Sequence, residues 1–496
     1  MKDLHAYEVL KDVEILDSYT IKVFGLTLPV IITRDRRYIV REPEPPISHE
    51  ELVRLVEEIR SGKVNVHDIN SKELRYFILR EQGLKELEPL LNDVQIEDIF
   101  VNEDYIDVMH SKYGLLRTNL HVDDILSLIE RIALISGSYV NYALPRRRVT
   151  IARGKTRFRF SILLAPDAVS KTTISIRRLD FSLYPLPKLI ANGCIPAIVA
   201  AYLVSLINFK RTGLITGVPS SGKTTTLVSL LPFVQNVKIA LIQHSDEIYL
   251  PPEYFTYESI RVDYEESRIG RGLMDNLDIT ILERSPGFIV IDDLHFDSKG
   301  LEPWALLQFG RVKCGLLVTL HGESPIKVLG RFKARPVLAD LREIEEAIDY
   351  VLVMSYDYEN RQRYVNSLYV LDSSHLVNIY SRIGNETLVA HPGNVYEAEP
   401  IRNAIRYSNF LIHRIEDEEY FIKYVFALAN LLEKISSSYP GMSFESFTKL
   451  VREIVIFRFK DILERYSSYS PPYHFMEKPP RVSLSNLFSH SEGSKP

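Results

Sequence analysis

One segment, GVPSSGKT at residues 217–224, constrains the fold of this chain more than any other. It matches the pattern G-x-x-x-x-G-K-[ST] at every fixed position, with a short apolar run (213–216) before it and a helical pattern (225–231) after it. In a loop of this kind backbone N–H groups face one point, and the amino end of the helix adds partial positive charge there. The segment therefore predicts a phosphate-binding loop between a strand and a helix.

The loop and a second apolar run together suggest a metal-assisted phosphate chemistry. Lys223 would reach the β- and γ-phosphate oxygens of a nucleotide, and the Thr224 hydroxyl would ligate Mg²⁺. A β-rich run, 287–293, ends in two aspartates, which supply the acidic partner that such a loop needs on a neighbouring strand. We expect Asp292 to hold Mg²⁺, directly or through water, and Asp293 to orient the attacking water.

A histidine follows another apolar run. Residues 316–320 are typical of a strand, and His321 comes directly after them. In an α/β fold the carboxyl end of a strand lies at the ligand edge of the sheet, so His321 is placed to sense a γ-phosphate. The alternative, a structural histidine with no role in binding, stays open.

Composition excludes several classes of protein. The chain has 496 residues, 46% hydrophobic and 25% charged, which is typical of a soluble globular protein of about three domains. Two cysteines exclude a disulfide framework and cysteine-cluster zinc sites, and a net charge of −5 argues against whole-chain attraction to nucleic acid. The first residues lack a signal peptide, so we expect a cytoplasmic protein. The charge-free run 189–209 contains Pro196 and predicts a buried core helix instead of a membrane span.

Shifts in pattern along the chain predict its organisation. A linker at 181–189 has two prolines and no helical period. The region 190–468 alternates β-rich runs with helical patterns, as a parallel α/β sheet does. We predict two α+β units before the linker, at 1–90 and 91–180, and a disordered Ser- and Pro-rich tail at 469–496.

Local signals predict particular elements before the linker. Ser48 and Glu51 form a capping box that starts a helix, and residues 123–136 are typical of an amphipathic helix that ends at Gly137. Two strands are expected at 156–164 and 172–179. Their arginines are either solvated strand faces or groups that reach a bound anion: Arg157, Arg159, Arg177 and Arg178.

Several short segments, by their order and spacing, resemble one protein family. They are DVQIEDIFVN (93–102), YGLLRTNLHV (113–122), RIALISGSYVNYALP (131–145), TISIRRL (173–179), SSGKTT (220–225) and TLHG (319–322). The family is that of the secretion-type motor ATPases, which drive type II secretion, type IV pilus assembly and the archaeal swimming filament (archaellum). The chain looks most similar to the archaeal branch, and the resemblance covers roughly residues 15–470.

The resemblance implies a fold and a mode of action. The fold would be a RecA-like P-loop motor domain of the α/β class, joined by the proline-containing linker to α+β, sensor-like N-terminal domains. Family members hydrolyse ATP with Mg²⁺ as ring-shaped homohexamers. They lie in the cytoplasm at the inner face of the cell membrane and push on a membrane-embedded platform protein by nucleotide-driven domain closure.

The resemblance also implies roles for individual residues. The nucleotide would be held by the loop residues Gly217, Ser220, Ser221, Gly222, Lys223, Thr224 and Thr225, and by Arg157 and Arg177 (or Arg178) of the N-terminal domain. Asp292 and Thr224 would bind Mg²⁺. The residues implied in catalysis are Asp293, Glu247 and His321.

The chain departs from the family at the acidic positions. The family pattern I-E-D-x-x-E is here IQHSDE (242–247), so that Glu247 is kept while Gln243 and His244 replace acids. The Gly-Glu-x-Arg that ends the family's acidic strand is here Asp-Asp-Leu-His (292–295). Gln243 cannot take a proton from water, and loss of a general base typically lowers a rate about 10²–10⁴-fold. Nucleotide binding is therefore better supported than fast hydrolysis.

Three functions remain open from the sequence. The first is the hexameric motor. The second is a diverged relative that binds ATP with slow or no turnover and has a regulatory or structural role. The third is a nucleic-acid translocase, for which the only dense basic cluster is 146–148 in a chain of negative net charge. We expect no nucleic-acid partner.

Overall fold

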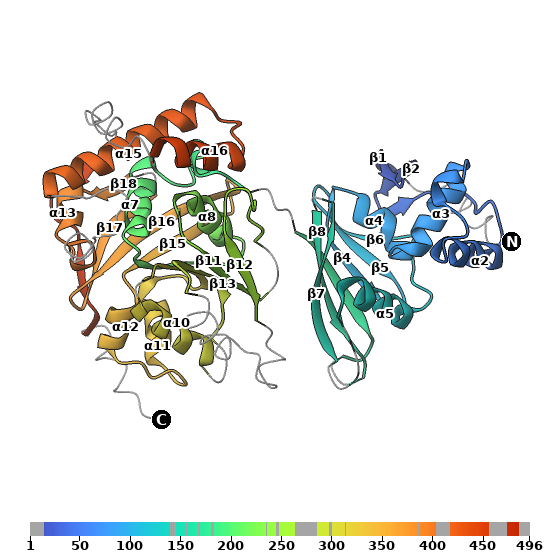
Figure 1. The fold of residues 1–496 in the computed structure, drawn as a ribbon, viewed down its shortest axis with the longest axis horizontal. Helices are drawn as coiled ribbons and strands as arrows, with labels where there is room; N and C mark the ends of the chain where they lie inside the picture. The colour runs from blue at the N-terminus through green and yellow to red at the C-terminus, as the bar shows by residue number, and fades with distance from the viewer. Residues whose placement is uncertain are drawn as a thin grey trace. The chain divides into compact units, whose positions relative to one another are not determined.

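The computed structural model describes residues 14–138, 140, 142, 145–154, 156–166, 169–179, 183–234, 236–244, 248–262, 285–296, 300–312, 314–384, 386–402, 417–455 and 474–485. The chain divides into two compact units, Met1–Phe181 and Ser182–Pro496 (Figure 1).

The first unit is built on one mixed sheet with helices packed against it (Figure 1). Its nine described strands lie in the order β1-β2-β3-β6-β5-β4-β9-β8-β7, and all neighbours are antiparallel except β3 and β6. The strands are β1 (Ile15–Val23), β2 (Leu26–Thr33), β3 (Arg37–Val40), β4 (Ile96–Asn102), β5 (Ile106–His110), β6 (Gly114–Thr118), β7 (Arg146–Arg153), β8 (Thr156–Leu163) and β9 (Thr173–Leu179). The helices are α2 (His49–Arg60), α3 (Lys72–Gln82), α4 (Glu88–Asn92) and α5 (Ile125–Ser136), with 3₁₀ turns at Val66–Asp68 and Lys85–Leu87.

Local signals placed these elements well. The Ser48 side chain accepts from the N–H of Glu51, and the Glu51 carboxylate accepts in return from the N–H of Ser48, so the capping box starts α2. Helix α5 ends at Gly137 in the left-handed conformation (φ 64°), which glycine adopts at low cost. The boundary predicted near residue 90 does not separate two units, because β3 pairs with β6 and all nine strands share one sheet.

The second unit is an α/β layer structure. Its sheet has the order β12-β11-β13-β14-β10-β15-β16-β17-β18-β19, with β20 beside β17. The neighbours along β12-β11-β13-β14-β10-β15 are parallel, and those along β15-β16-β17-β18 are antiparallel. Helices α7, α8, α15 and α16 lie on one face and α10, α11 and α12 on the other (Figure 1). The predicted α/β class with a preceding α+β part is confirmed.

The strands of this sheet are β10 (Thr212–Gly217), β11 (Ile239–Gln243), β12 (Tyr257–Arg261), β13 (Phe288–Leu294), β14 (Leu316–His321), β15 (Tyr350–Asp357), β16 (Gln362–Asp372), β17 (His375–Ile383), β18 (Glu386–Ala390), β19 (His474–Met476) and β20 (Arg481–Ser483). The helices are α6 (Leu186–Ala191), α7 (Ala197–Asn208), α8 (Lys223–Leu230), α10 (Leu301–Val312), α11 (Pro325–Lys333), α12 (Leu341–Ala347), α13 (Pro392–Tyr396), α15 (Glu418–Ser438) and α16 (Phe444–Leu450). A 3₁₀ turn covers Leu231–Phe233, and a π-helical turn covers Val451–Val455.

Helix α7 is the charge-free segment that the sequence placed in the core. Residues 197–207 are all buried, and the helix packs against α15. A helix that is apolar on every side is stable in water only when it is covered in this way. Within the described ranges, none of the helices combines the length and the apolar character that crossing a membrane requires.

The C-terminal segment departs from the prediction of a disordered tail. Residues 474–476 form β19, which pairs in parallel with β18, and residues 481–483 form β20, which pairs antiparallel with β17. Leu484 is fully buried. The Ser- and Pro-rich composition did not predict this strand pairing, since two three-residue strands have no recognisable period.

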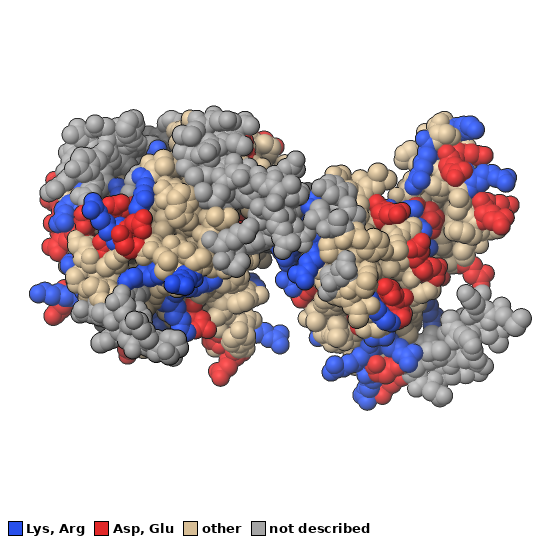
Figure 2. All heavy atoms as spheres, turned by 90° about the horizontal axis from the view of Figure 1, so that it is seen from below, with Lys and Arg blue, Asp and Glu red and all other residues tan. Residues whose placement is uncertain are grey.

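Figure 2 shows basic and acidic side chains intermingled on the visible face of each unit.

Candidate functional site

The loop between β10 and α8 carries the predicted phosphate site. A Cβ atom on Gly217 would lie 2.4 Å from the carbonyl oxygen of Met354, so a larger residue does not fit there. Gly222 precedes α8 in a left-handed conformation (φ 90°), and no side chain among the described residues caps the helix. The first N–H groups of α8 are therefore oriented toward an external acceptor, as they are in phosphate-binding loops.

Lys223, the first residue of α8, is buried within this loop, with 8% of its surface exposed. Its Nζ atom donates to the carbonyl oxygens of Val218 (3.1 Å) and Gly217 (3.3 Å) and lies 3.4 Å from Nδ1 of His321. Burial lowers the pKa of Lys223, and the two aspartates at the end of β13 partly offset that effect. An ammonium group that is shielded from water interacts strongly with phosphate oxygens.

Thr224 and Asp292 form the candidate metal site, and Thr319 holds the Asp292 carboxylate. Oδ1 of Asp292 accepts hydrogen bonds from Oγ1 of Thr224 (2.9 Å) and Oγ1 of Thr319 (2.6 Å), and Asp292 is buried. Adjacent ligands of an octahedral Mg²⁺, each about 2.1 Å from the ion, lie about 3 Å apart. The Thr224 and Asp292 oxygens already have this separation. A hydroxyl and a carboxylate, completed by phosphate and water oxygens, are the hard ligands that Mg²⁺ prefers, so the residues fit the ion.

Asp293 follows directly and lies between two imidazoles. Its backbone is left-handed (φ 61°), and its N–H donates to Oγ1 of Thr319 (2.7 Å). One carboxylate oxygen lies 3.2 Å from Nε2 of His295 and the other 3.2 Å from Nε2 of His321. Burial raises the pKa of Asp293, but the hydrogen bond from His295 and the charges of the nearby histidines outweigh burial, and the pKa is lowered overall.

The tautomer of His321 follows from its neighbours. Burial and the charge of Lys223 lower the pKa of His321 despite the opposing charge of Asp293. An ammonium group only donates, so Nδ1 of His321 faces Lys223 as an acceptor and the ring proton lies on Nε2, toward Asp293. A carboxylate with a lowered pKa that lies between two imidazoles is suited to orienting water more than to removing its proton.

Gln243, at the end of β11, has a structural role. Its Oε1 accepts from the N–H of Ile248 (3.0 Å), while its Nε2 donates to Oγ of Ser259 (2.9 Å) and to the carbonyl oxygen of Ile248 (3.3 Å). The side chain is buried. A carboxylate could not donate the last two bonds. This explains why an amide stands at position 243, where the resemblance predicts an acid.

Parallel strands bring one set of predicted residues together and leave others apart. Because β10, β13 and β14 run parallel, their carboxyl ends meet at one edge. Lys223, Thr224, Asp292, Asp293 and His321 gather at this edge, beside the loop residues Gly217, Ser220, Ser221 and Gly222. Glu247 lies outside the described residues.

The predicted arginines belong to the first unit. Arg157 is on β8 and Arg177 is on β9, where its Nε lies 2.7 Å from a carboxylate oxygen of Asp98. Arg178 donates to the carbonyl oxygens of Leu91, Asp93 and Ile96, and its guanidinium stacks on Phe158. These contacts give Arg178 a structural role in the sheet. A phosphate contact by Arg157 or Arg177 stays a prediction.

Sequence reasoning missed four contributors to the site. They are Thr319, His295, Glu302 and Arg363. Thr319 was detectable, because it stands two residues before His321 on β14 and so faces the same side of the strand. Arg363 was not, since it arrives from β16 and donates from Nε to the carbonyl oxygen of Ser220 (2.9 Å).

A cavity of about 280 Å³ opens beside the first turn of α8. Thr225 and Thr226 form one wall, and the hairpin that joins β15 to β16 forms another. The lining, apart from these threonines, combines apolar, amide and two guanidinium side chains with a glycine: Tyr184, Leu189, Asn192, Cys194, Gly222, Arg361, Gln362 and Arg363.

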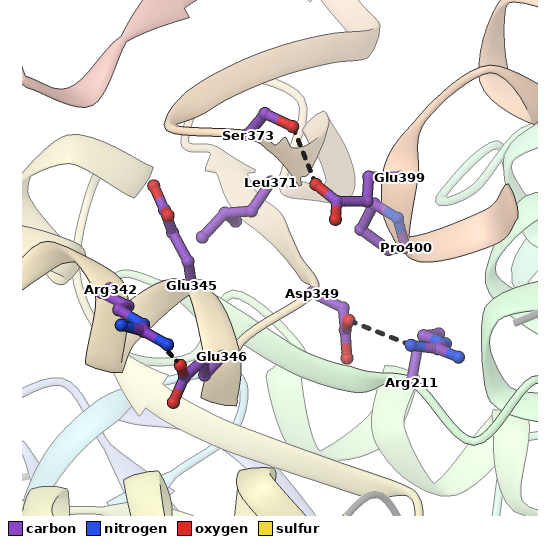
Figure 3. Close-up of a pocket in the computed structure, with 9 residues that line it drawn as sticks. All are labelled: Arg211, Arg342, Glu345, Glu346, Asp349, Leu371, Ser373, Glu399 and Pro400. Atoms are coloured by element: carbon purple, nitrogen blue, oxygen red, sulfur yellow. Dashed lines mark hydrogen bonds and ion pairs between the residues drawn. The ribbon is translucent and has the colours of Figure 1, made fainter. Parts of the chain in front are cut away.

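Another cavity, of about 350 Å³, lies where β10 and β15 begin, at the opposite edge of the sheet (Figure 3). Asp349 faces Arg211 there at 3.5 Å and accepts from the N–H of Thr212 (2.7 Å). Arg342 and Glu346 form an ion pair on α12 at 2.9 Å. Four carboxylates and two guanidinium groups line this cavity, and we assign it no ligand.

Comparison with known proteins gives distant relatives. No family model matches the chain. Three uncharacterized proteins of Methanocaldococcus jannaschii are similar: MJ0900 (27% identity, 56% of this chain and 50% of the relative), MJ0781 (25%, 49% and 38%) and MJ1287 (24%, 53% and 96%). The chain thus spans half or less of the length of the first two.

Two of the solved structures that are similar to the chain are bacterial ATPases. One is the VirB11 ATPase of the Brucella suis type IV secretion system in complex with sulphate, with 16% identity, a TM-score of 0.29, and coverage of 59% of this chain and 97% of that one. The other is the Legionella pneumophila ATPase DotB, with 14% identity, a TM-score of 0.39, and coverage of 72% and 92%.

Proposed function

We propose that this chain binds ATP with Mg²⁺ at the β10–α8 loop and hydrolyses it. The observation that carries the proposal is the Thr224–Asp292 contact of 2.9 Å, with the spacing of two Mg²⁺ ligands, directly beside the buried ammonium of Lys223. A chance match to the loop motif would not bring a buried aspartate from another strand to the loop threonine.

Each group of site residues would contact a different part of the nucleotide. The first turn of α8 and Lys223 would hold the β- and γ-phosphates, and bound Mg²⁺ would neutralise part of their charge. Asp293, with an imidazole 3.2 Å from each carboxylate oxygen, would orient water at the γ-phosphate end, and His321 would keep its carboxylate in place. The α-phosphate would then lie near Thr225, and the base and sugar would enter the 280 Å³ cavity behind it.

The resemblance of the sequence to secretion-type motors supports a finer proposal. The chain would act as a homohexameric motor for a type II or type IV secretion-like machine, a type IV pilus-like filament or an archaellum. It would work in the cytoplasm at the inner face of the membrane, against a membrane-embedded platform protein. Arg157 and Arg177 would then contact phosphate when the domains close.

A second function, nucleotide binding with slow or no turnover, is favoured by two observations. The Gln243 side chain bonds to Ile248 and to Ser259 of β12, and the lowered pKa of Asp293 makes it a weak base. In that case the chain would have a regulatory or structural role in a secretion-like system instead of driving it.

The first experiment is phosphate release from Mg²⁺–ATP by the purified chain, with nucleotide binding measured on the same samples. Lys223→Ala should lose binding at least tenfold, because an ammonium in a dry loop is the main counter-charge to the phosphates. Lys238→Ala is the matched control, since Lys238 pairs with Glu258 beside the opposite end of β11. Equal affinity in all three proteins would overturn the proposed function, whereas tight binding without turnover would select the second function.

A further inference from the structure

Beyond the groups that would touch nucleotide, a buried carboxylate lies behind Asp293. Glu302, in the first turn of α10, is 4% exposed. Its Oε2 accepts from the backbone N–H of His295 at 2.9 Å. Its carboxylate oxygens also lie 3.2 and 3.3 Å from Nε2 of His244. One side chain thus links the end of β11, the turn after β13 and the start of α10.

His244 is held from both sides. Nδ1 lies 3.2 Å from the carbonyl oxygen of Val262, and Nε2 faces Glu302. Its ring packs edge-on against His295, with 4.8 Å between ring centroids and an interplanar angle of 76°. His295 in turn lies 3.2 Å from the carboxylate of Asp293. The chain of contacts therefore runs from Glu302, both directly and through His244, to His295 and then to Asp293.

The turn that carries Asp293 needs such support. Its left-handed backbone (φ 61°) is a conformation that a residue with a Cβ adopts at a cost, and it persists only where neighbours determine it. Two residues before Glu302, the backbone at Gly300 packs closely against Pro336, since a Cβ atom there would lie 2.8 Å from Cγ of that proline. The Glu302 carboxylate is thus buried at a closely packed helix start and bonds to the turn through the N–H of His295.

We propose that Glu302 is a positioning residue for Asp293, acting through the His295 backbone and through the His244–His295 ring contact. This inference rests on the proposed function, since Asp293 must have a reacting water to orient. Glu302 touches none of the groups assigned to phosphate or Mg²⁺. Its removal should therefore lower turnover and leave nucleotide affinity as it is.

The test compares kcat for phosphate release with the Kd for Mg²⁺–ATP. Glu302→Ala should lower kcat on the order of 10- to 100-fold with Kd within about twofold, as expected for a supporting residue. Glu302→Gln should keep kcat within about threefold, because an amide oxygen can accept from His295 while the amide N–H donates to His244. Asp349→Ala is the matched control, because Asp349 is also 4% exposed and also accepts from a backbone N–H, at the opposite edge of the sheet.

A double variant makes the test independent of general destabilisation. His244→Phe keeps a ring against His295 and removes the bond to Glu302. If both residues act through one turn, kcat of the double variant with Glu302→Ala should be no lower than that of the worse single variant. Independent, multiplying losses would overturn the inference, as would a kcat loss in Glu302→Ala no larger than in Asp349→Ala, or a matching loss of affinity.

The failure of the two proposals can be told apart. A wild-type chain that binds no nucleotide would remove the proposed function itself. A wild-type chain that binds Mg²⁺–ATP without turnover would leave nucleotide binding intact and overturn the positioning role, since Asp293 would then have no step to be positioned for.

Discussion

At the scale of single residues, the site depends on hydrogen-bond roles that the chemical type of each side chain permits. Lys223 can only donate, so His321 must accept at Nδ1 and present its proton to Asp293. Gln243 must both accept and donate at Ile248, which no ionised carboxylate can do. The departures from the family pattern are therefore consistent with their surroundings and are not simple losses.

The hydroxyl of Thr224 gives the sharpest prediction at this scale. Thr224→Ala removes one of two Mg²⁺ ligands, so the gain in ATP affinity caused by Mg²⁺ should fall on the order of tenfold or more. Affinity measured in a chelator should stay unchanged, because the phosphate contacts of Lys223 and α8 remain. Thr224→Ser keeps the hydroxyl and serves as the control. Titration of ATP with and without Mg²⁺ checks this, and equal losses in both conditions would contradict a metal role.

Gln243 tests whether restoring an acid restores a base. Gln243→Glu puts a carboxylate beside the carbonyl oxygen of Ile248 in a buried place and should lower the unfolding free energy by about 1–3 kcal/mol. Turnover should not rise, since the side chain at position 243 faces Ile248 and Ser259. Urea unfolding together with phosphate release measures both effects. A rise in turnover would show that the acid faces the nucleotide after all.

At the scale of elements, the edge where parallel strands end assembles the site. β10 supplies the loop, β13 the aspartates and β14 the pair Thr319 and His321, because neighbouring parallel strands place their carboxyl ends together. Helix α10 then adds Glu302 from one face of the sheet, and the start of β16 adds Arg363. Strand and helix patterns predicted most of these elements within a few residues. They could not predict which elements would become neighbours.

At the scale of the whole molecule, long-range pairing decides where each unit begins and ends. The parallel pair β3–β6 joins regions on both sides of the predicted boundary at residue 90 into one sheet. In the second unit, β19 and β20 return from the C-terminal segment to β18 and β17. Each junction depends on backbone hydrogen bonds between segments far apart in the chain, which local composition does not record.

The returning C-terminal strands give a prediction for stability. Leu484 is fully buried against the second unit, so Leu484→Ala should lower the unfolding free energy by about 2–5 kcal/mol. Ile383→Ala, at a position that is 64% exposed, is the control and should change it by less than about 0.5 kcal/mol. Thermal or urea unfolding measures the difference. Similar stability in both variants would mean that the segment after β19 does not pack in solution as it does here.

The sequence by itself determined the loop motif, the acidic pair after an apolar strand, and the α/β class, since these depend on short spacings and on local periodicity. The arrangement of His244, His295 and Glu302, the structural bonds of Gln243 and the return of the C-terminal strands were decided only by the tertiary structure. An eight-residue motif indicates what one loop can bind. Which distant side chain comes to support that loop depends on strand order, and strand order is set by the burial of whole faces.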